Sequence, residues 1–316
     1  MDVVTIGESM VVFTPTSDGL MRYADQFTKK IGGAESNVAI GLSRLGHQAG
    51  WISKVGDDEF GKAILSFLKG EGIDVHQVTI DSQAPTGIYF KEPRRKNHTN
   101  VYYYRKGSAA STLTPSDLDE AYISRAKYLH LTGITPALSE SCRETVFEAI
   151  TIAKKHGIPV IFDPNLRMKL WDEQTARETL LKIASQADII LPGVAEGEFL
   201  FGESDPMRLG EIFLQHGSSI VVLKVGAKGA YYFTDTEKKL VPGLPVDQVV
   251  DPVGAGDGFA AGFISGLLDG VDLYASVERG NAAGALVTMV NGDAEGLADR
   301  QDLEFFMSRN TEDIVR

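Results

Sequence analysis

Short apolar runs alternate with longer amphipathic segments along most of this chain. The apolar runs are Val3–Ile6, Gly50–Lys54, Tyr128–Leu131, Val160–Phe162, Ile189–Leu191 and Ile220–Leu223. The segments between them have helical spacing, beginning with Asn37–Leu45, which Gly46 closes, and Glu59–Lys69, which ends near Gly70. A short strand that is apolar on both sides needs helices on both faces of its sheet. The pattern therefore predicts an α/β fold with a doubly wound, mostly parallel sheet.

Two segments depart from this alternation because strand-like residues follow one another without a helix. Met10–Phe13 leads into a polar stretch, and a later segment alternates apolar and polar positions on both sides of a predicted hairpin loop at Glu92–Asn100. Alternation of this kind is typical of an antiparallel sheet with two different faces. We predict a small antiparallel β lid, formed by inserted segments at about 10–30 and 84–106 and able to exclude water from a site below it. The expectation is one folding unit over residues 1–316.

Composition and charge narrow the class of protein. The chain has 316 residues, of which 43% are hydrophobic and 23% charged, as is usual for a soluble enzyme. A net charge of −12 argues against nucleic acid and anionic membranes as partners, so any phosphate site must be a local arrangement. The single cysteine, Cys142, excludes an internal disulfide. Because the chain has no basic leader and no apolar run of about 18 residues, we expect a cytoplasmic protein.

The most informative motif is Asp251-Pro252-Val253-Gly254-Ala255-Gly256-Asp257. Its glycines tolerate unusual backbone angles, and an apolar stretch with helical spacing follows. We interpret the motif as a tight turn that leads into a helix N-terminus, where unpaired N–H groups favour an anion. Asp257 would then lie beside a bound phosphate and accept a hydroxyl proton during phosphoryl transfer. An ordinary glycine-rich turn is the alternative.

Three further segments have the composition of ligand-binding loops. In Gly32-Gly33-Ala34-Glu35-Ser36-Asn37, the Asn37 amide offers a donor and an acceptor for hydroxyl groups. Lys224-Val225-Gly226-Ala227-Lys228-Gly229 follows a buried strand and would let a nucleotide pass close to the backbone. In Asp163-Pro164-Asn165-Leu166-Arg167, the arginine follows a strand and can bind phosphate or carboxylate with two hydrogen bonds. Each segment could instead be a common turn or a surface arginine paired with an acid.

The lid hairpin carries an arginine among tyrosines. Tyr103 and Arg105 share one face of their strand, and Tyr89 is expected beside them. This set suits a small acidic ligand with hydroxyl groups, and a solvated strand edge is the alternative.

Taken together, these residues resemble the ribokinase-like (PfkB) family of carbohydrate kinases over essentially the whole chain. The segments Gly32–Asn37 and Asp251–Asp257 are similar to its two signatures. The resemblance implies ATP as the phosphoryl donor, an anion hole from the amides of Gly254 to Asp257, and Asp257 as the catalytic base. The nucleotide-binding residues that it implies are Asn165, Arg167, Lys224, Gly226, Ala227, Lys228, Gly229, Gly254, Ala255, Gly256 and Asn281.

Further motifs look like the branch of this family that phosphorylates the 6-hydroxyl of 2-keto-3-deoxygluconate. They include Leu131–Leu138, Asp163–Arg167 and Gly292–Gly296. The resemblance implies a small acidic sugar, and Arg105 and Arg167 would supply the cations that its carboxylate needs. The substrate-binding residues expected are Gly33, Ala34, Asn37, Tyr89, Tyr103, Tyr104, Arg105, Arg167, Asp257 and Asp293. A fructokinase or ribokinase-type sugar kinase and a non-catalytic sugar or nucleotide sensor on the same fold are the alternatives.

The resemblance also implies Mg²⁺ with the ATP. The family often carries Asn-x-x-Glu near the metal, whereas Gly193-Val194-Ala195-Glu196 keeps only the glutamate, so we expect Glu196 to organise Mg²⁺ through water. Many relatives bind potassium, and Asp251 with the Val253 carbonyl could contribute to such a site, which the sequence does not decide. Exposed strand edges on the lid predict a homo-oligomer.

Overall fold

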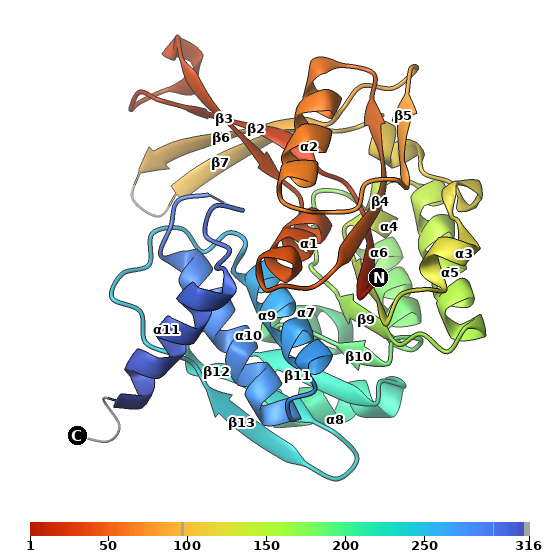
Figure 1. Ribbon diagram of the computed structural model, residues 1–316, viewed down its shortest axis with the longest axis vertical. Helices are drawn as coiled ribbons and strands as arrows, with labels where there is room; N and C mark the ends of the chain where they lie inside the picture. Colours follow the sequence, from red (N-terminus) through yellow and green to blue (C-terminus); the bar gives the residue numbers. More distant parts are fainter. Residues whose placement is uncertain (96–97, 293, 313–316) are drawn as a thin grey trace.

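The computed structural model describes residues 1–95, 98–292 and 294–312. Within these residues, nine strands form a central sheet in the order β13-β12-β11-β10-β9-β8-β1-β4-β5 (Figure 1). Neighbouring strands from β11 to β5 run parallel, and β12 and β13 add an antiparallel hairpin at one edge. The strands are β1 (Val3–Ile6), β4 (Ala49–Gly56), β5 (Val78–Asp81), β8 (Tyr128–Thr132), β9 (Val160–Asp163), β10 (Ile189–Ile190), β11 (Ile220–Lys224), β12 (Gly229–Phe233) and β13 (Lys238–Pro242). The predicted, mostly parallel sheet is confirmed.

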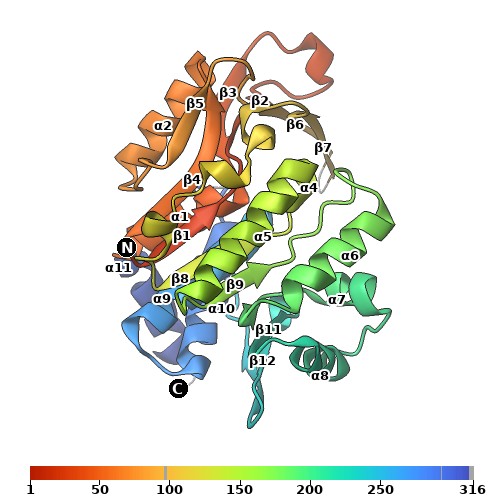
Figure 2. The same cartoon turned by 90° about the vertical axis from the view of Figure 1, so that its right-hand side faces the viewer.

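Helices cover both faces of this sheet, as the views in Figures 1 and 2 show. Apolar side chains of α1 (Ala34–Arg44), α2 (Glu59–Gly70), α9 (Ala255–Asp269) and α10 (Leu273–Thr288) belong to the core on one face. The core on the other face takes side chains from α3 (Glu120–Ile123), α5 (Glu140–Lys155), α6 (Glu173–Ala184), α7 (Val194–Phe201) and α8 (Pro206–His216). Two further helices are α4 (Thr135–Leu138) and α11 (Arg300–Glu312). The sheet is therefore doubly wound.

A row of glycines lets α9 lie very close to α10. Gly258, Gly262 and Gly266 lie on one side of α9, and an added Cβ at each would stand 2.6, 2.6 and 2.7 Å from atoms of α10. Real Cβ contacts are longer than this, so larger side chains would push the two helices apart. The glycine row therefore fixes the position of the N-terminus of α9.

A second sheet of four strands lies apart from the central one, in the order β3-β2-β6-β7 (Figure 1). The pairs β2–β3 and β6–β7 are antiparallel, and β2 and β6 join them in parallel. The strands are β2 (Met10–Pro15), β3 (Phe27–Gly32), β6 (Ile88–Arg95) and β7 (His98–Tyr104). The predicted small sheet with antiparallel hairpins is thus present beside the doubly wound domain.

Two predicted boundaries were wrong. Most of the hairpin loop placed at Glu92–Asn100 is strand, because Glu92 and Asn100 pair across the ladder and the Asn100 amide donates to the Glu92 carboxylate at 3.3 Å. Residues 96–97 of that loop lie outside the described residues. The first helix begins at Ala34 and not at Asn37, because Gly33 caps it and the backbone N–H of Asn37 already donates to the Gly33 carbonyl.

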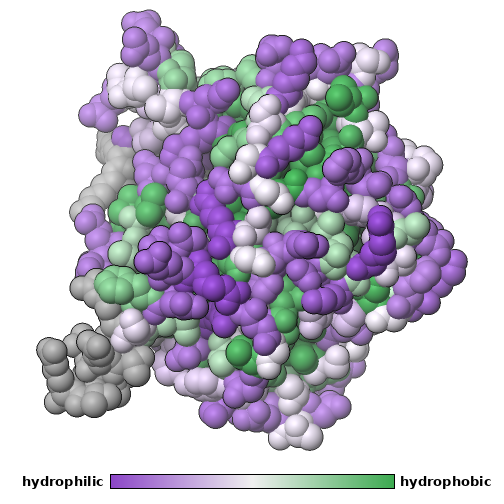
Figure 3. All heavy atoms as spheres, viewed as in Figure 1, coloured by the Kyte–Doolittle hydropathy of each residue, from purple (hydrophilic) through white to green (hydrophobic). Residues whose placement is uncertain are grey.

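The face of the molecule in Figure 3 is mainly hydrophilic, with apolar side chains scattered between polar ones. None of the helices in the described ranges is long and apolar enough to cross a membrane.

Candidate active site

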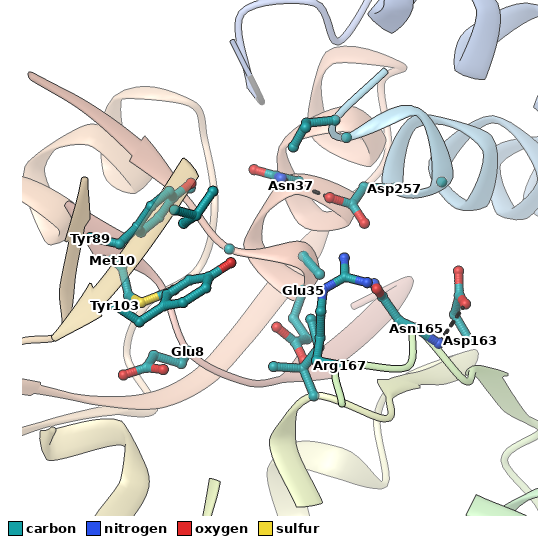
Figure 4. A pocket seen from close by; sticks show the side chains of 18 of the residues that line it. Glu8, Met10, Glu35, Asn37, Tyr89, Tyr103, Asp163, Asn165, Arg167 and Asp257 are labelled. Carbon is teal, nitrogen blue, oxygen red and sulfur yellow. Dashed lines mark hydrogen bonds between the residues drawn. The ribbon is translucent and has the colours of Figure 1, made fainter. Parts of the chain in front are cut away.

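A polar cavity of about 400 Å³ lies between the four-stranded sheet and the carboxyl ends of the central strands (Figure 4). The β6–β7 hairpin lines it with odd-numbered side chains only: Tyr89, Lys91, Val101, Tyr103 and Arg105. Successive side chains of a strand point to opposite faces, and the face that the alternation assigned to Tyr89, Tyr103 and Arg105 is the one that lines the cavity. Tyr89 and Tyr103 are paired across the hairpin, with ring centroids 5.4 Å apart.

Asp257 lies in the first turn of α9, at the wall of this cavity. The turn before the helix needs Gly254, whose φ of +84° lies in the left-handed region. Asp257 is 9% exposed, and Asn37 Nδ2 donates to its Oδ2 at 2.8 Å (Figure 4). The first-turn amides and the helix dipole favour an anion beside this carboxylate. The predicted tight turn and helix start are confirmed, and the catalytic role of Asp257 stays a prediction.

An apolar cavity of about 360 Å³ lies on the other side of the same turn. Leu244, Val246, Val249 and Phe259 contribute its apolar lining. Seven predicted nucleotide residues also line it: Lys224, Gly226, Ala227, Gly229, Ala255, Gly256 and Asn281. The Asn281 amide donates to the carbonyls of Val241 and Pro242 at 3.0 and 3.2 Å, which ties α10 to the end of β13.

The polar and apolar cavities meet at Lys224, Pro252 and Gly256, which line both. An added Cβ at Gly256 would have the Lys224 ammonium at 3.8 Å as its nearest neighbour. Of the other predicted nucleotide residues, Asn165, Arg167 and Gly254 line the polar cavity. Lys228 lines a third cavity, of about 600 Å³, together with Gly193 and Glu196. The predicted nucleotide-binding residues therefore lie around the place where these cavities meet.

Two acids and a lysine form a charged group at this junction. Lys224 Nζ lies 2.7 Å from Asp163 Oδ2, and Glu196 accepts hydrogen bonds from the amides of Gly193 and Leu166 at 2.7 and 2.9 Å. Burial, followed by the neighbouring Asp163 charge, raises the pKa of Glu196. Burial opposes the charged form of Lys224, but the neighbouring acids outweigh it and raise the lysine pKa. Lys224 is therefore cationic at neutral pH.

The donors near Glu196 fit a magnesium ion that is held mainly by phosphate oxygens and water. In the described ranges, no group of three or more His, Cys, Asp or Glu side chains could hold a metal by itself. Both Glu196 oxygens already accept an amide, and each keeps a further lone pair for a water. Mg²⁺ prefers oxygen ligands and retains several waters.

Arg105 lines the polar cavity, but its charge is already balanced. Its Nε and terminal nitrogen lie 2.7 and 2.5 Å from Glu8 Oε2, and Ser108 Oγ donates to Glu8 Oε1. Arg105 is 8% exposed and Glu8 only 2%. The sequence prediction treated Arg105 as a cation available to a ligand, and it missed this buried partner.

Arg167 is exposed and points into the polar cavity, and its guanidinium donates to the Leu166 carbonyl at 3.2 Å (Figure 4). Gly33, Ala34 and Asn37 line the same cavity. The structure does not bring Tyr104 there, because its side chain points to the opposite face of β7 and its ring contacts Phe90. Asp293 lies outside the described residues.

Asp251 and Val253, the predicted monovalent-cation residues, lie in the loop before α9. The Asp251 carboxylate accepts the Val253 amide at 3.0 Å and lies 3.8 Å from the Lys91 ammonium of β6.

Nine residues that line the polar cavity were not in the predicted set: Glu8, Met10, Gly32, Glu35, Lys91, Val101, Ile134, Asp163 and Pro252. Glu8, Ile134 and Asp163 lie at or just after the carboxyl ends of β1, β8 and β9, which is where open α/β sheets bind ligands. That rule, applied to every strand, would have found them.

The helix start of α9 favours an anion and lies between a polar and an apolar cavity, an arrangement that fits the transfer of a phosphoryl group. The model of the pfkB family of carbohydrate kinases matches residues 1–300, and the chain belongs to this family. It is 45% identical to 2-dehydro-3-deoxygluconokinase of Bacillus subtilis (strain 168) over 98% of this chain and 96% of the relative. The enzyme of the same name from Thermoproteus tenax is 37% identical, over 96% of this chain and 93% of the relative. An E. coli structure described as a ribokinase II, with ATP and Mg²⁺, superposes with a TM-score of 0.90 at 29% identity over 98% and 99%.

Proposed function

We propose that the protein is a 2-keto-3-deoxygluconate kinase, which transfers the γ-phosphoryl group of ATP to the 6-hydroxyl of 2-dehydro-3-deoxy-D-gluconate. The observation that carries the proposal is the position of Asp257, a carboxylate at a helix N-terminus where a polar and an apolar cavity meet. The polar cavity takes the sugar and the apolar one takes the base and ribose of ATP. The γ-phosphoryl group then lies at the first turn of α9.

The reaction needs one proton acceptor and an anion site. The oxygen of the 6-hydroxyl attacks the γ-phosphorus, the bond from that phosphorus to the bridging oxygen of ADP breaks, and the hydroxyl proton goes to Asp257. The Asn37 amide holds the Asp257 side chain in place through its 2.8 Å hydrogen bond. Amides of the first turn of α9 and the Lys224 ammonium stabilise charge on the phosphoryl oxygens.

Magnesium supplies charge neutralisation and alignment of the phosphates when it is bound. Glu196 would hold it through water, with Asp163 nearby. Support for ATP and Mg²⁺ comes from the E. coli relative, which contains both.

The acid end of the sugar is assigned to Arg167, whose guanidinium is exposed in the polar cavity. Arg105 lines the same cavity and contributes to the local potential, although Glu8 balances its charge. The Asn37 side-chain oxygen is buried without a partner among the described residues and suits a sugar hydroxyl.

Release of ADP in the presence of 2-keto-3-deoxygluconate, its galactonate epimer, fructose and ribose tests this function. We expect turnover with the keto acids and little with the neutral sugars. Asp257→Asn should keep the fold and ATP binding and lower kcat by ~10²–10⁴, the usual contribution of general acid–base catalysis. A parent enzyme that prefers fructose would contradict the substrate, and near-parental kcat in Asp257→Asn would contradict the base.

Several finer points belong to the same proposal. The four-stranded sheet acts as a lid on a single α/β unit, and its edges pair with a second copy to form a homo-oligomer in the cytoplasm. Potassium binds at Asp251 and the Val253 carbonyl. Light scattering with and without substrate tests the assembly, and turnover in K⁺ against tetramethylammonium tests the cation site.

A further inference from the structure

Glu35 is a buried carboxyl group that the proposed mechanism does not use. It lies in the first turn of α1, at the wall of the polar cavity and two residues before Asn37 (Figure 4). Its exposure is 0%. Its partners are Thr132, the last residue of β8, and Thr135, the first residue of α4, whose hydroxyl oxygens lie 2.5 and 2.9 Å from Glu35 Oε1.

Counting protons around Glu35 shows that two hydroxyl groups are too few. Thr135 Oγ1 also lies 3.0 Å from the Ile6 carbonyl oxygen, which can only accept. The three oxygen–oxygen contacts Thr132–Glu35, Thr135–Glu35 and Thr135–Ile6 each need a proton, and the two threonines bring one each. The Thr132 hydroxyl additionally accepts the Ile134 amide and gains no proton from it. The third proton is supplied if Glu35 is a carboxylic acid that donates from Oε1 to Thr135.

The other oxygen of Glu35 has no hydrogen-bond partner. Oε2 is buried and unpartnered among the described residues. It packs over Gly7, where an added Cβ would stand 2.2 Å from Glu35 Cδ and 2.4 Å from Oε2. An ionised carboxylate carries charge on both oxygens and strongly disfavours such a site, whereas the carbonyl oxygen of a neutral acid tolerates it far better. The surroundings of Oε1 and of Oε2 therefore both indicate that Glu35 is protonated.

We propose that Glu35 is a positioning residue that works as a protonated carboxylic acid and ties the first turn of α1 to the end of β8 and the start of α4. That turn of α1 carries Asn37, whose amide holds the Asp257 carboxylate, so the tie sets the position of the base. In this respect the inference rests on the proposed role of Asp257.

Electrostatics agree with this geometry. Burial raises the pKa of Glu35 above its ordinary value. It outweighs the threonine hydrogen bonds, the backbone N–H of Glu35 itself and the Arg105 charge, which all act in the opposite direction. Arg105 is the charged group that acts on Glu35 from the lid side, and Glu8 balances it.

The test compares Glu35→Gln with Glu148→Gln, which removes an acid from an exposed position of α5. In infrared difference spectra at pH 7, we expect the carbonyl stretch of a protonated carboxylic acid in the parent and in Glu148→Gln, and its loss in Glu35→Gln. Because the neutral amide has nearly the same shape and its nitrogen can donate to Thr135 as the acid does, Glu35→Gln should keep kcat within about threefold of the parent. Glu35→Ala removes the tie and should lower kcat roughly 10²-fold at unchanged KM for ATP, since the base is displaced.

Thermal unfolding at a series of pH values gives a readout that needs no turnover. A folded-state pKa above the unfolded value means that the parent loses stability as pH rises from about 4.5 through the folded pKa. The Tm of Glu35→Gln minus that of the parent should therefore be constant below this window and increase across it. Glu148→Gln should show no such increase.

Three results would overturn the proposal: no carboxylic acid band that depends on Glu35, a Tm difference that does not change with pH, or a folded Glu35→Gln enzyme that loses more than tenfold in kcat. Should Glu35→Ala not fold, Gly7→Ala displaces the same carboxyl group and is expected to lower kcat. Absence of kinase activity in the parent would contradict the proposed function and would leave the infrared and Tm results readable.

Discussion

Replacing Arg105 by methionine tests whether this arginine is first of all the structural partner of Glu8. The two side chains are 8% and 2% exposed, and two guanidinium nitrogens of Arg105 lie within 2.7 Å of Glu8 Oε2. Methionine keeps much of the side-chain volume but removes the charge. Glu8 would be left as a buried carboxylate with the Ser108 hydroxyl on its other oxygen.

The expected loss of stability in Arg105→Met follows from burial of the Arg105–Glu8 pair. Breaking a buried ion pair by removing one partner costs about 3–5 kcal/mol, because the remaining charge is uncompensated. Removing both charges, as in Glu8→Gln with Arg105→Met, should restore stability to within about 1 kcal/mol of the parent, since no unpaired charge remains.

Urea unfolding at pH 7, followed by circular dichroism, measures these free energies for the parent, both single variants and the double variant. We expect Arg105→Met to be much less stable than the double variant. The reasoning is refuted if Arg105→Met lies within about 1 kcal/mol of the parent, or if the double variant is as unstable as Arg105→Met. A stable Arg105→Met enzyme that loses turnover only with keto acids would make Arg105 mainly a substrate ligand.

Two further variants probe the junction and the acid end of the sugar. Gly256→Val places a branched side chain toward the Lys224 ammonium, where the two cavities meet, and should lower kcat by ~10²–10³, comparable to loss of an anion-hole donor. Gly70→Val, in open space at the end of α2, is the control. Equal kcat in the two variants would show that the turn before α9 is only structural. Arg167→Ala should leave stability nearly unchanged and lower kcat/KM for the keto acid by a factor that corresponds to about 1.5–3 kcal/mol, whereas Lys169→Ala in the same loop should not. An equal loss with fructose would mean that Arg167 contacts phosphate and not the sugar carboxylate.

Much of the fold and part of the site could be predicted because local patterns report local geometry. Apolar runs such as Val160–Phe162 marked buried parallel strands, and the alternation around Tyr89 and Tyr103 marked the hairpin face that meets the cavity. The glycines before Asp257 marked a tight turn and a helix start, and Gly254 is the glycine whose backbone angle requires that residue type. The hairpin loop was placed wrongly because polar Glu92 and Asn100 satisfy one another across the ladder, and the start of α1 was placed wrongly because Gly33 caps the helix without a side chain.

The sequence by itself determined the layers of this protein, the face of each element that is buried, and the helix start that can bind an anion. Only the tertiary structure decided which polar and charged side chains are partners: Arg105 with Glu8, Lys224 with Asp163, and the Asn37 side-chain amide with Asp257. Periodicity depends on the neighbours of a residue along its own helix or strand, so it can be read from a few successive positions. Pairing across 61 to 220 positions depends on how whole elements pack, and no local pattern contains that information.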